Sequence, residues 1–260
     1  RTVSSAASDV YKRQAGGCVM GPIERVAVIG AGNMGSGITQ KSAQEGFAVQ
    51  MVDKEDGFVQ RGMETINGFL DEAIQRRIFS EEKVEGIISN ISVGIGVDSI
   101  HEDTDLVIEA EFEDIDVKSS VLNDLASSCN RETIIATNTS SLSVEDLATL
   151  SDRPDRFIGL HFFYHPAKNR LVEIIPSSRT SSETIQSVIQ YCGAMGKVVI
   201  LCKDRPGFVV NRFFVPWLNE ACKLLDEGFG TPAEIDNVAK DCFDIGTVSY
   251  THLTLPTKPF

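Results

Sequence analysis

Short apolar runs alternate with longer amphipathic stretches over the first half of the chain. Runs of this kind predict buried strands, and apolar residues repeating every three or four positions predict helices between them. Alternating strands and helices are typical of a mostly parallel sheet covered on both faces, which is an α/β fold. The expected strands are 25–30, 48–53, 91–94, 106–109 and 133–137, and the expected helices are 33–46, 56–78 with a partner at 81–87, 117–127 and 144–150.

A β-hairpin is predicted further along, where the β-rich runs 157–163 and 171–175 flank a turn-like HPAKN sequence. A hairpin folded about Ala167 sets His161 opposite Glu173 with both side chains on one face. An imidazole held by a carboxylate is suited to act as a general base for an alcohol proton. A pH-inert ion pair at the surface is the alternative, because structural histidine–carboxylate contacts are common.

A glycine-rich sequence follows the first predicted strand and opens the first helix. Gly30 permits a tight turn, Gly32 lets the backbone approach a diphosphate, and Gly35 lets helix and strand pack closely. Asp53, at the end of the second strand, can accept hydrogen bonds from a ribose 2′-hydroxyl and would repel a 2′-phosphate. The pattern predicts dinucleotide binding and favours NAD over NADP; a glycine-rich turn without a ligand is the alternative.

Polar residues also follow the fourth and fifth predicted strands. They are Glu113, Lys118 and the Asn-Thr-Ser-Ser sequence at 138–141. Ligands of open α/β sheets bind beyond the carboxyl ends of the strands, so these groups are expected to border the nicotinamide half of the crevice. Ser140 is a candidate substrate contact, while Ser141 or Ser143 is a candidate N-cap of the following helix, and both roles can hold together.

The charge balance excludes several partners. The net charge is −13, and the longest basic cluster is Arg76-Arg77, which argues against nucleic acid and anionic membrane partners. No apolar run approaches the roughly 20 residues of a transmembrane helix. The six cysteines form no CxxC pair, so we expect free thiols, no metal site and a cytoplasmic location, with the mitochondrial matrix as the alternative.

Both ends of the chain differ from its middle. Residues 1–19 lack periodicity and precede a natural start at Met20, so we expect a non-native or disordered leader. Residues 248–260 break a helical pattern abruptly and carry two prolines near the end, which suggests a non-native tail. The expectation is a truncated protein.

Five motifs in this order, GAGNMG, NTSSL, GLHFF, LVEII and DRPGFVVNR, resemble the L-3-hydroxyacyl-CoA dehydrogenase family from about residue 25 to 246. The resemblance implies a Rossmann-type, doubly wound, mostly parallel sheet at 20–204 that binds NAD. It also implies a truncated, all-α substrate and dimerisation domain at 205–247. The implied activity is oxidation of an L-3-hydroxyacyl-CoA to a 3-ketoacyl-CoA, with an acyl-CoA as substrate and a homodimer as the complete protein, the latter less expected for a truncated chain.

By motif, the resemblance assigns His161 as the base and Glu173 as the residue that orients it, with Ser140 and Asn211 as hydrogen-bond partners of the substrate oxygen. The implied NAD contacts are Gly30, Gly32, Asn33, Met34, Gly35, Asp53, Glu113, Lys118 and Asn138.

Asn211 can also be assessed from its surroundings. Apolar positions over 206–225 predict a buried helix with Pro206 near its first turn. An amide without a partner near the start of such a helix would cost about 1 to 3 kcal/mol, which favours a functional partner. An asparagine bonded to nearby backbone is the alternative.

Some features depart from the family or favour a rival. Relatives commonly read HFFNP where this chain has HFFYHP, so Tyr164 and His165 alter the loop that lines the acyl pocket, and His165 is interpreted as a turn or surface residue. Arg76 and Arg77 are candidates for CoA phosphate contacts. One rival is a β-hydroxyacid dehydrogenase of the hydroxyisobutyrate type, which uses a helical lysine; no helix here matches it, and Lys223 lies two turns beyond Asn211. The other rival is a non-catalytic NAD-binding protein.

Overall fold

The computed structural model describes residues 21–243 and divides the chain into two compact units between Arg205 and Pro206. The leader expected at 1–19 and the tail expected at 248–260 lie outside the described residues. We describe each unit by itself.

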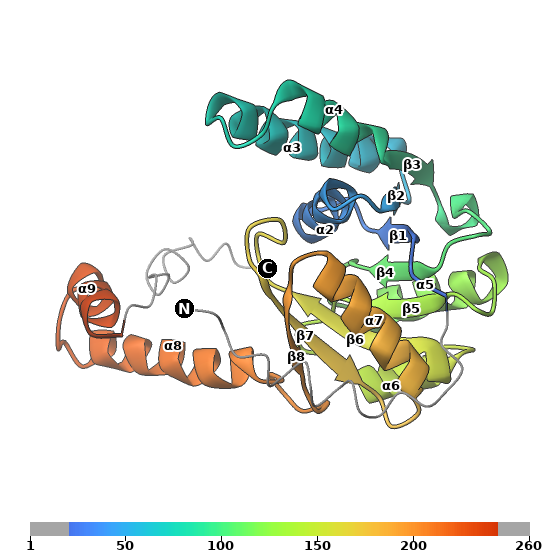
Figure 1. The fold of residues 1–260 in the computed structure, drawn as a ribbon. Helices are drawn as coiled ribbons and strands as arrows, with labels where there is room; N and C mark the ends of the chain where they lie inside the picture. Colours follow the sequence, from blue (N-terminus) through green and yellow to red (C-terminus); the bar gives the residue numbers. More distant parts are fainter. Residues whose placement is uncertain (1–20, 244–260) are drawn as a thin grey trace. The chain divides into compact units, whose positions relative to one another are not determined.

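The first unit is built on an eight-stranded sheet in the order β3-β2-β1-β4-β5-β6-β7-β8 (Figure 1). Only β6 and β7 pair antiparallel in this sheet, and the remaining neighbours pair parallel. The predicted doubly wound, mostly parallel α/β fold is confirmed. The strands are β1 (Arg25–Ile29), β2 (Ala48–Asp53), β3 (Ile91–Ile95), β4 (Leu106–Glu109), β5 (Ile134–Thr137), β6 (Phe157–Phe162), β7 (Leu171–Pro176) and β8 (Val198–Leu201).

Helices and two short 3₁₀ turns connect the strands. The predicted helix 56–78 is too long: it ends at Gln75, because Arg77 adopts a left-handed backbone with φ 57°. The helix expected at 117–127 begins two residues earlier, where Asp114 caps the first amides. The helices are α2 (Asn33–Gln44), α3 (Asp56–Gln75), α4 (Glu81–Ser89), α5 (Ile115–Ser128), α6 (Val144–Leu150) and α7 (Ser182–Ala194), with η1 (Val97–Ser99) and η2 (Pro154–Arg156).

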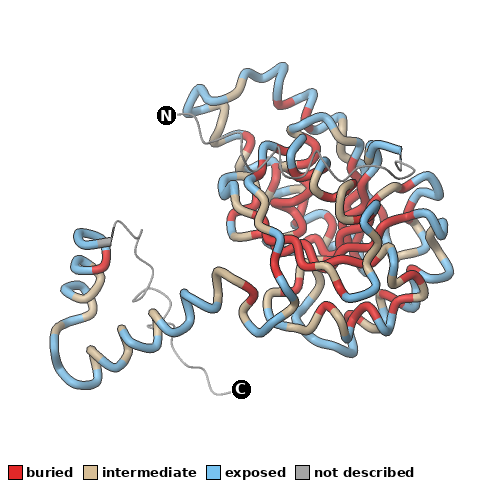
Figure 2. The backbone as a smooth tube through the Cα atoms, turned by 60° about the horizontal axis from the view of Figure 1, so that its bottom comes forward, coloured by how far each residue is buried: buried red, intermediate tan, exposed pale blue. Residues whose placement is uncertain are grey.

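One face of the sheet forms the larger core. Alternate strand residues, such as Val28, Ile108 and Leu160, share a single buried cluster with residues of α2, α3, α4 and α7. Helices α2 and α7 are joined by a 2.6 Å hydrogen bond between the Ser42 and Tyr191 hydroxyls. The buried residues concentrate around the sheet in Figure 2.

The opposite face carries α5 and α6, which contact each other, and α6 lies over β6 and β7. Gly159 makes this close approach possible, because a Cβ there would come within 2.7 Å of a Val144 methyl group on α6. Alternation along the strands sends the side chains of Glu109, His161 and Glu173 to this face. Polar side chains are therefore gathered on one face near the carboxyl ends of the parallel strands.

The described part of the second unit, residues 206–243, contains α8 (Val210–Asp226) and α9 (Pro232–Phe243). Pro206 was predicted in the first turn of the helix, but Gly207 and Phe208 have φ values of 77° and 44°, so the helix begins only at Val210. The prediction that this helix is buried is wrong, since none of its residues is buried.

An apolar groove of about 330 Å³ runs between α8 and α9, lined by residues such as Trp217, Leu224 and Ile235. Phe213 is 77% exposed. Across residues 21–243, every helix falls short of the length and apolar character that a membrane crossing would require.

Candidate active site

The glycine turn between β1 and α2 has the shape of a diphosphate cradle. Gly30 has φ 95°, and a Cβ there would lie 2.7 Å from the Ala110 carbonyl oxygen beyond β4. A Cβ on Gly35 would lie 1.7 Å from the Gly30 oxygen, whereas one on Gly32 would meet nothing within 4 Å. Gly30 and Gly35 thus serve internal packing, while Gly32 borders open space at the amino end of α2.

This open space fits the diphosphate of a dinucleotide. The first amides of a helix have no partners within the helix and carry a partial positive charge that favours anions. Asn33 and Met34 are the first two residues of α2, and no acidic side chain lies in its first turn. The residues present therefore agree with the cofactor expected from the sequence.

Asp53 is tied to the same turn at the end of β2. Its Oδ2 accepts the Ala31 N–H at 2.7 Å, and its Oδ1 accepts the Lys54 N–H at 2.7 Å. The carboxylate is thereby fixed beside the glycine turn, although only 8% of the residue is exposed. Each carboxylate oxygen can accept a further hydrogen bond, so the position remains suited to a ribose hydroxyl.

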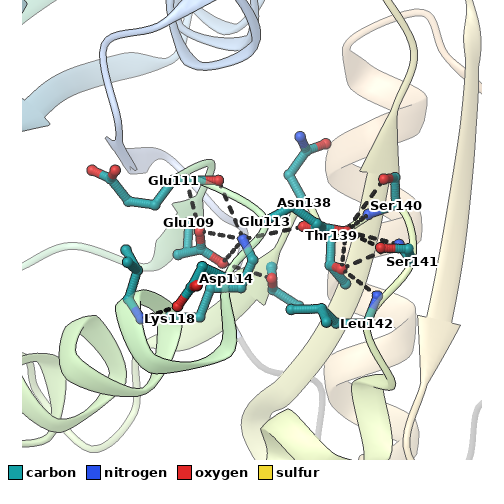
Figure 3. A network of polar contacts seen from close by, with 12 residues as sticks. Glu109, Glu111, Glu113, Asp114, Lys118, Asn138, Thr139, Ser140, Ser141 and Leu142 are labelled. Atoms are coloured by element: carbon teal, nitrogen blue, oxygen red, sulfur yellow. Dashed lines mark hydrogen bonds and ion pairs between the residues drawn. The ribbon is translucent and has the colours of Figure 1, made fainter. Parts of the chain in front are cut away.

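A buried ion pair lies at the ends of β4 and β5, drawn in Figure 3. Lys118 Nζ contacts the two Glu109 carboxylate oxygens at 2.7 and 2.9 Å, and both side chains are 1% exposed. The Thr137 hydroxyl donates to Glu109 at 2.6 Å, and the Glu111 N–H donates at 2.7 Å. Lys118 was expected to border the crevice, but its side chain is directed inward and neutralises Glu109.

Glu113 organises the loop after β5 (Figure 3). Its Oε1 accepts the N–H groups of Ser140 and Ser141 at 2.7 and 2.8 Å and the Thr139 hydroxyl at 2.7 Å. The Ser140 hydroxyl also lies within 3.2 Å. Burial alone would raise the pKa of Glu113, but these hydrogen bonds and the charge of Lys118 outweigh it and lower the pKa to about 2.

Neighbouring residues complete this loop. The Asn138 side-chain oxygen accepts the Phe162 N–H at 2.9 Å, which joins the ends of β5 and β6. Of the two candidate N-caps, Ser143 caps α6, with its hydroxyl accepting the Asp146 N–H at 3.1 Å.

The predicted hairpin pair is formed. His161 on β6 lies opposite Glu173 on β7, and His161 Nδ1 is 2.8 Å from Glu173 Oε2. Glu173 is fully buried and His161 is 6% exposed. A surface ion pair is thus ruled out as the description of this contact. A buried carboxylate that accepts the Nδ1 proton directs Nε2 away from itself and fixes the ring orientation.

Asn211 is in the first turn of α8, in the second unit, and is half-buried. His161, Glu173 and Ser140 belong to the first unit.

Comparison with known proteins identifies the family. Residues 25–205 match the model of the 3-hydroxyacyl-CoA dehydrogenase NAD binding domain, and residues 207–252 match the C-terminal domain of 3-hydroxyacyl-CoA dehydrogenase. The chain belongs to the 3-hydroxyacyl-CoA dehydrogenase family. NAD is accordingly the cofactor of its first unit.

Individual relatives agree with this family. The chain is 37% identical to the mitochondrial hydroxyacyl-coenzyme A dehydrogenase of Sus scrofa, over 84% of this chain and 71% of the relative. It is 38% identical to the 3-hydroxybutyryl-CoA dehydrogenase of Bradyrhizobium diazoefficiens, over 84% and 74% respectively. Among solved structures, the (S)-3-hydroxybutyryl-CoA dehydrogenase of Ralstonia eutropha is 39% identical with a TM-score of 0.82, covering 86% of this chain and 79% of that one.

His165 occupies a different environment from the one expected. It lies in the β6–β7 turn, but it is buried rather than on the surface. Its ring packs edge-on against Phe69 of α3 with centroids 4.3 Å apart, and its Cε1 would lie 3.3 Å from a Cβ at Gly37 of α2. Burial, followed by the charges of Lys168 and Lys197, lowers the pKa of His165. The lowered pKa favours the neutral imidazole at pH 7.

Lys197 fastens the same turn from the start of β8. Its Nζ donates to the carbonyl oxygens of Pro166 and Asn169, the latter at 2.6 Å. Burial lowers the pKa of Lys197 to about 8. Tyr164, the other residue that departs from the family's usual sequence in this turn, is 66% exposed and faces solvent.

Sequence reasoning missed three residues near the site. Glu109 was interpreted only as the last residue of a strand. A carboxylate at the end of an apolar run, with Lys118 nine residues later, is a signal that could have indicated the buried ion pair. Glu111 lies beside the glycine turn, with its nitrogen 3.3 Å from a Cβ built on Gly30. Cys202 contacts Glu173, and no pattern in the sequence predicts this contact.

Proposed function

We propose that this chain oxidises an L-3-hydroxyacyl-CoA to the 3-ketoacyl-CoA with NAD and catalyses the reverse reduction. The buried His161–Glu173 pair at 2.8 Å, within a unit that matches the family's NAD binding domain, carries the proposal. The relatives from Sus scrofa and Bradyrhizobium diazoefficiens act on compounds of this class according to their names.

His161 is the proposed general base. With Nδ1–H donating to Glu173, Nε2 holds the lone pair that takes the substrate hydroxyl proton. The bound NAD supplies the acceptor for the hydride that leaves C3. Glu173 stabilises the positive charge that His161 gains, because the carboxylate is buried where water screens little.

Ser140 and Asn211 are proposed to hydrogen-bond the substrate oxygen, which gains carbonyl character as the proton and hydride leave. Support for Ser140 comes from Glu113, which holds its backbone and hydroxyl in one conformation. Support for Asn211 is its place in the family's PGFxxNR motif at the start of α8.

We further propose the NAD contacts that the motifs imply. Open space at Gly32 and the anchored carboxylate of Asp53 support the diphosphate and ribose contacts. The proposed set is Gly30, Gly32, Asn33, Met34, Gly35, Asp53, Glu113, Lys118 and Asn138. Because Lys118 is 1% exposed, its proposed effect on the cofactor is through its charge and through Glu113.

The domain assignment and substrate anchoring also stand as proposals. Residues 20–204 would bind NAD, and 205–247 would contribute to the substrate site and to dimer formation. Arg76 remains a candidate for a CoA phosphate: it is exposed at the end of α3 and pairs there only with Glu72, at 2.6 Å, among the ion pairs of the described residues. The free thiols of the described cysteines support a reducing compartment, either the cytoplasm or the mitochondrial matrix.

An NADH absorbance assay with acetoacetyl-CoA tests the function directly. Turnover of acetoacetyl-CoA supports the proposal, while turnover of free hydroxyisobutyrate alone would favour the rival dehydrogenase. The rival's lysine has little structural support, since Lys223 is exposed and pairs with Glu220 at 3.1 Å. NADH binding without turnover of either substrate would favour a non-catalytic NAD-binding protein.

A further inference from the structure

Cys202 directly follows β8 and lies beside the proposed catalytic pair. Its N–H donates to the Ile174 carbonyl oxygen at 2.8 Å, which fastens it to the strand that carries Glu173. The residue is only 5% exposed. The backbone pairing of β7 and β8 therefore sets the position of the thiol.

The thiol contacts the Glu173 oxygen that does not face the histidine. Cys202 Sγ lies 3.8 Å from Glu173 Oε1, while Glu173 Oε2 lies 2.8 Å from His161 Nδ1. The two carboxylate oxygens of Glu173 thus contact different residues. His161, Glu173 and Cys202 form a row across β6, β7 and the end of β8.

The thiol is a hydrogen-bond donor in this row. Burial, and after it the negative charge of Glu173, raises the pKa of Cys202 to about 11, so the proton stays on sulfur at neutral pH. The Ile200 carbonyl oxygen, at 3.6 Å, is a second acceptor for the same proton. An ionised carboxylate is the stronger acceptor of the two, which favours donation to Glu173.

We propose that Cys202 is a positioning residue that holds the Glu173 carboxylate in the orientation required by His161. The inference rests on the proposed function and deepens it. The terminal bond of a glutamate is a soft torsion, so donors to the carboxylate restrict its rotation. The Cys202 thiol, at Oε1, adds to this restriction and helps to keep Oε2 directed at Nδ1. Because S–H is a weak donor, the effect is modest.

Cys202→Ala removes the donor and tests the inference. We expect kcat to fall roughly two- to tenfold, the range that corresponds to one weak hydrogen bond, while NADH affinity stays unchanged. Cys192→Ala is the matched control, because Cys192 is also buried but lies on α7 away from the pair. The control should lose stability to a similar degree and keep its kcat.

Cys202→Ser restores a donor of nearly the same size. Its kcat should recover part of the loss seen with alanine, because a hydroxyl is the stronger donor but its shorter bond to Cβ leaves it farther from Oε1. An unchanged kcat in the alanine variant would overturn the inference and leave Cys202 as a packing residue.

A readout independent of turnover separates this inference from the proposed function. The His161 Nδ1–H proton, which donates to a buried carboxylate, should give a far-downfield NMR resonance. We expect this resonance to shift in Cys202→Ala and to stay in place in Cys192→Ala. A shift without acyl-CoA turnover would refute only the proposed function, while turnover without a shift would refute only the role of Cys202.

Discussion

At the scale of single residues, the first unit keeps several ionisable side chains out of water beside the glycine turn and the β6–β7 hairpin. Each has a partner that offsets the loss of hydration: Glu109 has Lys118, and Glu173 has His161. Glu111 is the exception among the described carboxylates of this region, since its side chain has no hydrogen-bond or ion-pair partner there. This difference predicts different responses to substitution.

His161→Gln should remove the base while keeping a side chain that can still hydrogen-bond. We expect kcat to fall by roughly 100- to 10,000-fold, because a positioned base contributes about that factor. NADH affinity, measured by fluorescence titration, should stay nearly unchanged. An equal loss of turnover and of NADH affinity would contradict the assignment of His161 as the base.

Glu111→Gln should stabilise the protein at neutral pH. Burial, and then the charges of Asp53 and Glu109, raises the pKa of Glu111 above 4.5. A carboxyl group with a raised pKa in the folded state destabilises that state above this pKa, and the penalty disappears below the unfolded-state value. The Tm of the variant should therefore exceed that of the wild type at pH 7, with the difference vanishing below about pH 4.5.

The control for this change is Glu85→Gln on the exposed side of α4. This substitution removes one negative charge from the same acidic protein without touching the glycine turn. If both variants raise Tm equally, the gain comes from the net charge and not from the surroundings of Glu111.

At the scale of elements, loops at the carboxyl ends of β1, β4 and β5 are fixed by side chains from neighbouring segments. Asp53 holds the glycine turn, and Glu113 holds the loop from Thr139 to Ser141. The site is thus pre-ordered by contacts between elements that are distant in sequence.

Glu113→Gln should loosen the loop after β5. The shift of its pKa to about 2 corresponds to roughly 1 to 2 kcal/mol of stability after allowance for its partial exposure. This contribution is fully present above the unfolded-state pKa of 4.5 and is lost as the pH falls toward 2. Urea unfolding should therefore show the destabilisation at pH 7 and a shrinking difference below about pH 5. A difference that grows on acidification would contradict this account.

Two glycines of the cradle should respond differently to alanine. Gly32→Ala should fold with little loss of stability, because its Cβ meets nothing within 4 Å, yet NADH affinity should fall roughly tenfold or more as the methyl group enters the diphosphate space. Gly35→Ala should destabilise the fold itself by about 1 to 3 kcal/mol, because its Cβ would lie 1.7 Å from the Gly30 oxygen.

Gly68→Ala on the exposed face of α3 serves as the control for this pair, since its Cβ also meets nothing within 4 Å. It should raise stability by roughly 0.5 to 1 kcal/mol through helix propensity and leave NADH affinity unchanged. Unaltered NADH binding by Gly32→Ala would place the diphosphate elsewhere.

At the scale of the whole molecule, the chain carries a net charge of −13 while its proposed cofactor and substrate are anions. The field of the whole protein opposes their approach, and the amino end of α2 and a few basic side chains act only at short range.

Salt should therefore speed the association of NADH. The screening length falls from about 30 Å at 0.01 M salt to about 8 Å at 0.15 M, which removes long-range repulsion before it weakens short contacts. Stopped-flow fluorescence should show an association rate constant that rises severalfold over this range. A rate constant that falls with salt would mean that a local positive field dominates the approach.

Much of the fold could be predicted from sequence because its signals are local. Apolar runs located the first five strands, and the hairpin register followed from alternation around a short turn. The helix ends were less accurate: the stop at Gln75 depends on the left-handed Arg77, which has no glycine to announce it. The burial expected for α8 failed because amphipathicity shows which face is apolar and not whether another layer covers it.

The sequence by itself determined the order of elements up to the β6–β7 hairpin, the glycine cradle and the pairing of His161 with Glu173, because these depend on periodicity and short-range geometry; it did not predict α7 and β8. Only the tertiary structure revealed that Lys118 is directed inward to Glu109, that His165 is buried against α3, and that Cys202 reaches Glu173. These contacts join segments that come together only when the sheet and its helices pack. Their energies depend on burial and distance in three dimensions, which no local pattern of residues encodes.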